Sequence, residues 1–238
     1  MNVWNENFTV RHTEVSREGK LRIDAFFDYM QEAAANHATD LGCGLSDLET
    51  RGMMWVLSRL RLRIYRTPGI GERIAVTTWP SGVDKLFATR EFILTAGDEQ
   101  IAAGSSFWLL LDRARMRPLR VPESLPIPLP DNSGRERVFA DLPKLPRREC
   151  ADPLPLTVTE SQIDVNRHMN NARYVARLFD WLAVRLGSAP VVSEIQANFL
   201  IGTAPESVLT VSGSETDGVW YIEESVDSVP HFQAEVRL

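Results

Sequence analysis

Three residues in the second half of the chain have the side chains and the spacing of a reaction site. Asp164, Asn166 and His168 stand two positions apart in the stretch Asp-Val-Asn-Arg-His-Met-Asn-Asn. A histidine titrates near neutral pH and can act as a general acid or base. An aspartate beside it can orient the imidazole or activate water, and an asparagine amide can position water or a carbonyl group. Together these groups favour hydrolysis of an activated acyl group.

The stretch leads into a segment with the periodicity of a buried helix, residues 171–186. Apolar side chains recur there on one face, at Val175, Leu178, Phe179, Leu182 and Leu186. We expect Asn170 or Asn171 to be the N-cap, because an asparagine side chain accepts hydrogen bonds from N–H groups that the first turn leaves unpaired. The remaining N–H groups give the helix start a partial positive charge, which would stabilise a developing oxyanion.

Other kinds of site receive less support. One histidine and one aspartate are too few ligands for a metal, and the sequence has no second His/Cys cluster. It also lacks a G-x-S-x-G motif, a phosphate-binding loop and a dinucleotide fingerprint. The other histidines, including His37 and His231, are expected to be surface or packed residues. A structural alternative stays open for the stretch itself, since Asp164 could close an Asx-turn and Asn166 could adopt a left-handed conformation.

The chain divides into two halves with the same order of elements. In the first half, a helix is expected at residues 24–41, followed by strands at 53–65, 72–79, 86–95 and 100–112. In the second half, the helix at 171–186 precedes strands at 193–200, 206–212, 219–225 and 231–238. Pro80-Ser81-Gly82 is expected to end a strand, and nine prolines between positions 118 and 155 predict an extended linker. The predicted class is α+β, with an N-terminal unit at 1–120, a linker at 121–154 and a C-terminal unit at 155–238.

An internal duplication would explain this repetition and offers a control on the polar stretch. Aligning the two helix starts places residues 17–21, Arg-Glu-Gly-Lys-Leu, against residues 164–168. The first copy therefore enters its helix without Asp-x-Asn-x-His. Turn formation common to both copies does not account for these polar residues, so their presence favours chemistry.

Composition and charge restrict the class of protein. The 238 residues are 44% hydrophobic and 24% charged, a globular composition, and two cysteines fit a reducing compartment. We expect a soluble cytoplasmic protein, because the sequence shows neither a signal peptide nor a run long enough to span a bilayer. The net charge of −6 argues against nucleic acid. Four clustered arginines could nevertheless bind an acidic partner, or could simply be solvated: Arg113, Arg115, Arg117 and Arg120.

The sequence resembles the acyl-acyl carrier protein thioesterases of plants and bacteria. In the second half the resemblance rests on residues 164–171 and Tyr174. In the first half it rests on Tyr29-Met30-Gln31-Glu32-Ala33-Ala34 and Gly52-Met53-Met54-Trp55-Val56-Leu57, with shorter matches at Arg66-Thr67-Pro68, Thr78-Trp79-Pro80 and Ser106-Phe107-Trp108. The D-x-N-x-H-x-N-N element is typical of hot-dog thioesterases, and the first-half matches favour the carrier-protein branch.

The resemblance implies two tandem hot-dog units, each a long helix wrapped by a bent antiparallel sheet. It implies hydrolysis of fatty acyl-acyl carrier protein thioesters in fatty acid biosynthesis, without a metal or organic cofactor. The catalytic network would be Asp164, Asn166 and His168. The groups near the substrate would be Asn170, Asn171 and Tyr174. The first unit would form the acyl pocket, the arginine-rich segment would bind the acidic carrier protein, and the chain would be a monomer or a homodimer.

One departure from the family concerns the strand after the second helix. The family usually carries a glutamate there, and the corresponding position falls at Ile201 or Gly202. Glu194 and Glu206 are nearby in sequence. The chemistry could run on the aspartate and histidine alone. Alternatively, the chain could act on acyl-coenzyme A, or bind acyl chains without hydrolysing them.

Overall fold

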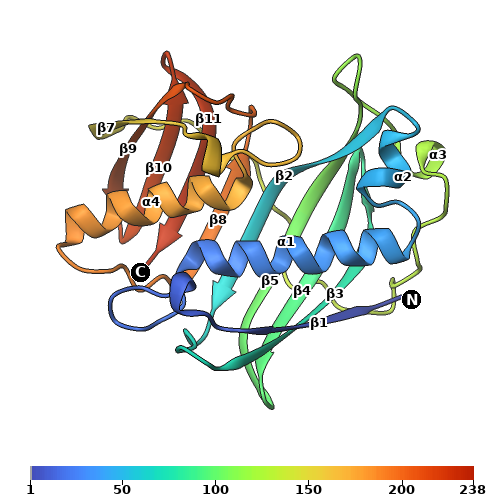
Figure 1. The fold of residues 1–238 in the computed structure, drawn as a ribbon, viewed down its shortest axis with the longest axis horizontal. Helices are drawn as coiled ribbons and strands as arrows, with labels where there is room; N and C mark the ends of the chain where they lie inside the picture. Colours follow the sequence, from blue (N-terminus) through green and yellow to red (C-terminus); the bar gives the residue numbers. More distant parts are fainter. Residues whose placement is uncertain (1) are drawn as a thin grey trace.

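The computed structural model describes residues 2–238, and the same order of elements occurs in each half (Figure 1). The first half contains α1 (Ile23–Asp40), α2 (Leu45–Glu49), β1 (Trp4–Thr9), β2 (Met53–Ile64), β3 (Arg73–Asp84), β4 (Phe87–Ala96), β5 (Glu99–Asp112) and β6 (Arg117–Pro118). A short helix, α3 (Val121–Ser124), follows. The second half contains β7 (Ala151–Thr157), α4 (Asn171–Leu186), β8 (Glu194–Phe199), β9 (Val208–Thr216), β10 (Val219–Val226) and β11 (Val229–Arg237).

All of these strands belong to one antiparallel sheet. Its order is β1-β3-β4-β5-β2-β8-β11-β10-β9-β7, with β6 paired to β5. The two halves join where β2 pairs with β8, from Arg59 opposite Asn198 to Arg63 opposite Glu194. Helices α1 and α4 lie on the same face of the sheet (Figure 1). The expected α+β architecture of two tandem hot-dog units is therefore confirmed.

Helix α1 is buried along the face that its spacing predicts. Phe26, Met30, Ala33 and His37 are all inaccessible to solvent. A Cβ on Gly104 of β5 would stand 2.9 Å from the backbone oxygen of Arg61 and 2.9 Å from Met30 Cε of α1, so this position requires glycine for space. The apolar layer beneath α1 continues beneath α4, and the two units share one hydrophobic core.

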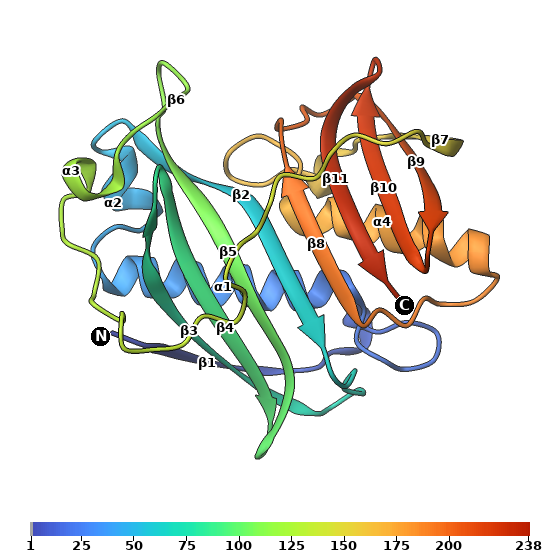
Figure 2. The same ribbon diagram turned by 180° about the vertical axis from the view of Figure 1, so that it is seen from behind.

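The chain between α3 and β7 crosses the opposite face of the sheet (Figure 2). Phe139, Leu142 and Leu145 are buried there. Arg59 Nη1 of β2 donates to Leu142 O (2.6 Å), and Gln196 Nε2 of β8 donates to Pro143 O (2.6 Å). This segment thus satisfies polar side chains of both central strands.

Two expectations about proline were wrong. Strand β3 does not end at Pro80 but continues to Asp84, with a register shift between Pro80 and Gly82. A β-bulge of this kind lets a strand continue past a residue that has no N–H donor. Pro153 and Pro155 lie in β7 rather than in a linker. Since β7 is at the edge of the sheet, its prolines do not interrupt a ladder on both sides.

Replacing Leu62 by alanine should lower the free energy of unfolding by about 2–5 kcal/mol. Leu62 is fully buried and lies opposite both Gly104 of β5 and Ile195 of β8. Because sheet and core continue across both units, urea unfolding should show one transition, with a lower midpoint in the variant. Val184→Ala, at an exposed position of α4, should change stability by no more than about 0.5 kcal/mol. Two separate transitions in the wild-type protein would contradict a shared core.

Candidate active site

The predicted catalytic residues lie in a tight hairpin loop before α4. Asp164 N donates to His168 O (2.9 Å) beside an antiparallel bridge between Ile163 and Met169. The loop is closed by Arg167 N, which donates to Asp164 O (2.9 Å). Asp164 Oδ1 accepts from the backbone N–H of Asn166 (2.8 Å), so the Asx-turn considered from the sequence does form.

The left-handed residue of this loop is Arg167, with φ of 64°, and not Asn166 as considered from the sequence. In a three-residue hairpin loop the left-handed conformation falls on the last loop residue, after the turn. The backbone of Asn166 is thus part of the turn, but its side chain is not. Neither the Asn166 amide nor the His168 ring makes a hydrogen bond with another of residues 2–238. Turn formation therefore explains the aspartate and leaves the other two side chains available for chemistry.

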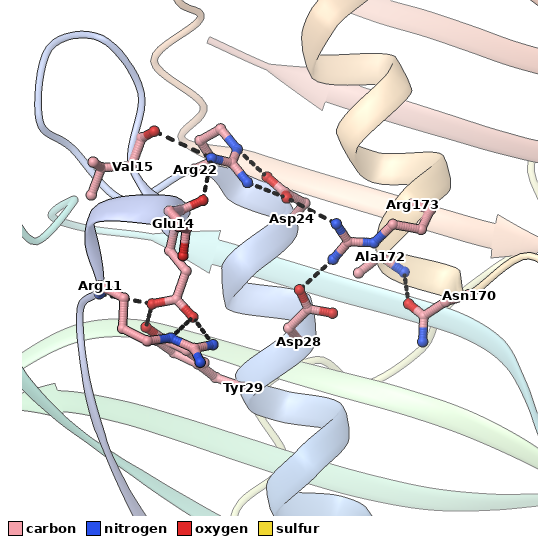
Figure 3. Close-up of polar contacts among 11 residues, drawn as sticks. Arg11, Glu14, Val15, Arg22, Asp24, Asp28, Tyr29, Asn170, Ala172 and Arg173 are labelled. Atoms are coloured by element: carbon pink, nitrogen blue, oxygen red, sulfur yellow. Dashed lines mark hydrogen bonds and ion pairs between the residues drawn. The ribbon is translucent and has the colours of Figure 1, made fainter. Parts of the chain in front are cut away.

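The start of α4 is fixed by its own cap and by α1. Asn170 is the N-cap, and its Oδ1 accepts from Ala172 N (2.8 Å). Asn171 Nδ2 donates to Gln31 Oε1 of α1 (2.9 Å). One turn toward the N-terminus of α1, Arg173 pairs with Asp28 and lies 3.9 Å from Asp24, which Arg22 also binds (Figure 3). These contacts hold the hairpin loop against the first unit.

One cavity of about 770 Å³ brings the predicted residues together. The side that carries the polar groups is lined by Asp164, Asn166, His168, Asn171 and Tyr174. Asn170, whose side chain is used in the cap, is not among the lining residues. Strands β2, β5 and β8 supply most of the other walls, and Lys144, which sequence reasoning missed, reaches the cavity from the chain between α3 and β7.

Of the two positions where a glutamate was expected, Ile201 and Gly202, the second is packed against the ring of His168. A Cβ on Gly202 would stand 2.8 Å from His168 Cγ and 2.9 Å from its Cδ2. Any side chain at this position would push the imidazole away. Neither nearby glutamate replaces the missing group: Glu194 pairs with arginines of β2, and Glu206 lies in an exposed turn. Within residues 2–238, Asp164 supplies the one carboxylate that lines this cavity.

A buried polar network supports the wall beside Gly202. Tyr174 Oη donates to Thr203 Oγ1 (2.7 Å) and accepts from Thr203 N (3.1 Å). Thr203 Oγ1 also bonds His231 Nδ1 (2.7 Å). Burial raises the pKa of Tyr174 to about 12 and lowers the pKa of His231, so the neutral ring can accept from the threonine hydroxyl. Thr203 and His231 were missed as supporting residues because nothing in the sequence links positions so far apart.

A second cavity, of about 240 Å³, continues from the first one beneath α1. The two cavities share Gln31, Ala35, Met54, Trp55, Trp108 and Asn166. Farther along α1 the second cavity is lined by Ala34 and Ala38 and then by Cys43 and Leu48. Small side chains on this face of the helix leave room for an apolar chain, and the space lies almost wholly in the first unit.

The four clustered arginines lie in the hairpin between β5 and β6 and just before α3. Arg113 pairs with Glu49, Arg115 with Asp112, and Arg120 lies 4.0 Å from Glu123. The backbone of Arg117 pairs with Asp112 of β5, but its side chain makes no hydrogen bond or ion pair with the part of the chain that the structure describes. Met116 and Pro118 of the same hairpin line the larger cavity, so these arginines lie beside its wall. In the described residues no helix is long and apolar enough to cross a membrane, and no cluster of three metal-binding side chains occurs.

Family models match the sequence over most of its length. The acyl-ACP thioesterase N-terminal domain matches residues 1–128, and the C-terminal domain matches residues 147–226. The palmitoyl-acyl carrier protein thioesterase of Gossypium hirsutum is 23% identical to this chain over 93% of its length. The enzyme of the same name from Arabidopsis thaliana is 28% identical over 79% of this chain. These alignments cover 58% and 48% of the relatives, so the chain spans about half the length of the curated relatives it matches.

Solved structures share the fold. An acyl-ACP thioesterase from Bacteroides thetaiotaomicron superposes with a TM-score of 0.82 at 22% identity, over 99% of this chain and 97% of that one. The 12:0-ACP thioesterase from Umbellularia californica gives 0.80 at 21% identity, over 100% and 97%. Together with the family models, the hairpin loop and the cavity it lines, these likenesses lead to one conclusion: the chain belongs to the acyl-ACP thioesterase family.

Proposed function

We propose that this chain hydrolyses fatty acyl thioesters of acyl carrier protein and releases the free fatty acid and the carrier protein. One observation carries the proposal: the unbonded side chains of Asn166 and His168 line a cavity that continues into an apolar space beneath α1. The names of the relatives, palmitoyl- and oleoyl-acyl carrier protein thioesterases, support the substrate class.

Hydrolysis would begin with attack of water on the thioester carbonyl carbon. His168 would take a proton from this water as the C–O bond forms and would give it to the sulfur as the C–S bond breaks. Asp164 Oδ2, which no described residue binds, can hold the water, and the Asn166 amide can orient it. At the start of α4, Asn170 accepts from the backbone N–H groups of Ala172 and Arg173. The backbone N–H of Asn171 is left as a free donor, and this group would stabilise the oxyanion.

The two units would divide the work. The C-terminal unit, which begins with β7, would supply the catalytic loop, and the N-terminal unit at 1–120 would hold the acyl chain, with the segment between α3 and β7 as the linker. The carrier protein would bind where the β5–β6 hairpin flanks the cavity, with Arg117 as the unpaired cation. We place the protein in the cytoplasm, as a monomer or a homodimer that uses no cofactor.

A second candidate function is binding of acyl chains without hydrolysis. The observation that favours it is the ring of His168 against Gly202, which leaves no room for a glutamate. Acyl-coenzyme A is the alternative substrate, because single hot-dog enzymes use similar loops. The three experiments below separate these possibilities.

Replacing His168 by alanine should lower kcat/KM for acyl-carrier protein by about 100- to 10,000-fold, the usual contribution of a general acid–base group. The measurement is release of free fatty acid from a panel of octanoyl, dodecanoyl and hexadecanoyl carrier protein. His12→Ala is the matched control, since His12 is exposed in a short turn remote from the loop in sequence. Wild-type protein that retains acyl groups without releasing fatty acid would establish the binder instead.

Replacing Gly202 by alanine should lower kcat by up to about 100-fold with little change in stability, because a small displacement of a catalytic group is enough for such a loss. The added Cβ would collide with the imidazole of His168. Gly134→Ala is the control, because a Cβ there meets nothing within 4 Å. Unchanged activity in Gly202→Ala would show that the ring position is not needed.

Reversing the charge of Arg117 should raise KM several-fold for acyl-carrier protein and leave KM for acyl-coenzyme A nearly unchanged. An exposed cation attracts an acidic protein surface, and the effect should shrink as salt is added. Wild-type kcat/KM should also be higher for the carrier protein than for coenzyme A with the same acyl group. Equal or better hydrolysis of the coenzyme A ester would favour the alternative substrate.

A further inference from the structure

The apolar cavity beneath α1 contains a buried cation. Arg90, on β4, lines this cavity together with Ala38 and Cys43. Only 8% of the Arg90 surface is exposed to solvent. Burial lowers the pKa of Arg90 to about 10, so the guanidinium is still charged at neutral pH. A charge in such a place is costly unless something pairs with it.

Arg90 has no acidic partner in the described chain. Its Nη1 bonds Thr78 Oγ1 (3.2 Å) and His37 Nδ1 (3.1 Å), and no carboxylate of residues 2–238 lies within ion-pair distance. The neighbouring Glu91 points away from the cavity and binds serines of β3 and β5. The Nε and Nη2 groups of Arg90 make no hydrogen bond with the described residues, and these two atoms are not fully buried. Donors of a buried cation therefore remain available to a ligand.

The cation stands at a definite place along the acyl path. Near the middle of α1, Gln31 bonds Asn171 beside the hairpin loop, and toward the C-terminal end of the helix His37 bonds Arg90. These two residues stand six positions apart in the helix, a rise of roughly 9 Å. An acyl chain with its thioester at His168 would run along this face and bring its distal end toward Arg90. A terminal methyl group there would leave the guanidinium donors without acceptors, whereas an oxygen would satisfy them.

We propose that Arg90 binds an acceptor oxygen at the distal end of the acyl chain, so that the preferred substrate is an acyl thioester with a hydroxyl or carboxylate group at that end. This inference rests on the proposed function for the position of the thioester. It assigns substrate selection to the first unit and to a residue that takes no part in bond breaking.

The direct test compares acyl-carrier proteins of equal chain length whose distal end is a methyl, a hydroxyl or a carboxylate group. Over octanoyl to hexadecanoyl lengths, the best oxygenated substrate should exceed its methyl counterpart in kcat/KM by about 10- to 100-fold, as expected for hydrogen bonds to a charged donor. A carboxylate that exceeds the hydroxyl would show pairing with the charge. Methyl-ended chains that are hydrolysed as well or better at every length would overturn the proposal.

Arg90→Met should abolish this preference while hydrolysis of the methyl-ended substrate stays equal or rises. Arg90→Lys, which keeps the charge, should retain part of the preference. Arg73→Met is the matched control, because it removes an exposed arginine of β3 that lines neither cavity and should leave the preference unchanged. If Arg90→Met fails to fold, the wild-type comparison decides alone.

A binding measurement tests the Arg90 subsite separately from the proposed hydrolysis. Calorimetry with His168→Ala protein needs no turnover and can compare dodecanoic acid with its distal hydroxy and dicarboxylic analogues. Tighter binding of the oxygenated acids by about tenfold or more would support the subsite even if no thioester were hydrolysed. Equal binding of all three acids would overturn it even if the chain were an active thioesterase.

Discussion

The pairing of β2 with β8 is the interaction on which the rest of this structure depends. It joins the sheets of the two units and places α1 and α4 side by side on one face. Arg61 and Arg63 of β2 hold the mostly buried carboxylate of Glu194 across this seam, and a one-residue slip would turn core side chains to the opposite face. With the register fixed, Gln31 can bond Asn171, and the hairpin loop of one unit lies beside a cavity that the other unit mainly builds.

The same close packing determines what the site can contain. The imidazole of His168 rests on Gly202, one of the two positions where the family resemblance led us to expect a glutamate. The position is therefore filled, and Asp164 is the carboxylate that remains in the lining of the larger cavity. One of its oxygens is used in the loop, so the proposed chemistry depends on the other oxygen and on His168. The network from Tyr174 through Thr203 keeps the wall behind them in place.

Periodicity predicted most of the helices and strands, and Asp164, Asn166 and His168, chosen for their types and spacing, line one cavity. The bounds of α4 and the cap at Asn170 agree with the structure because they depend on local chemistry. Local rules failed at Pro80 and Pro153, where a bulge and a sheet edge accommodate proline. Two features arise only when distant segments pack: the contact between Gly202 and His168, and the burial of Arg90 in the cavity. No local pattern in the sequence predicts them.

The central claim is that water, directed by the hairpin loop before α4, cleaves a carrier-bound thioester. Its most direct test is single-turnover hydrolysis of acyl-carrier protein in water enriched in oxygen-18, followed by mass spectrometry of every product. The account predicts a free fatty acid that carries one labelled oxygen, a carrier protein with a free thiol, and no covalent adduct on this chain. An acyl group that stays on the carrier protein, or one that is transferred to a side chain of this protein, would contradict it.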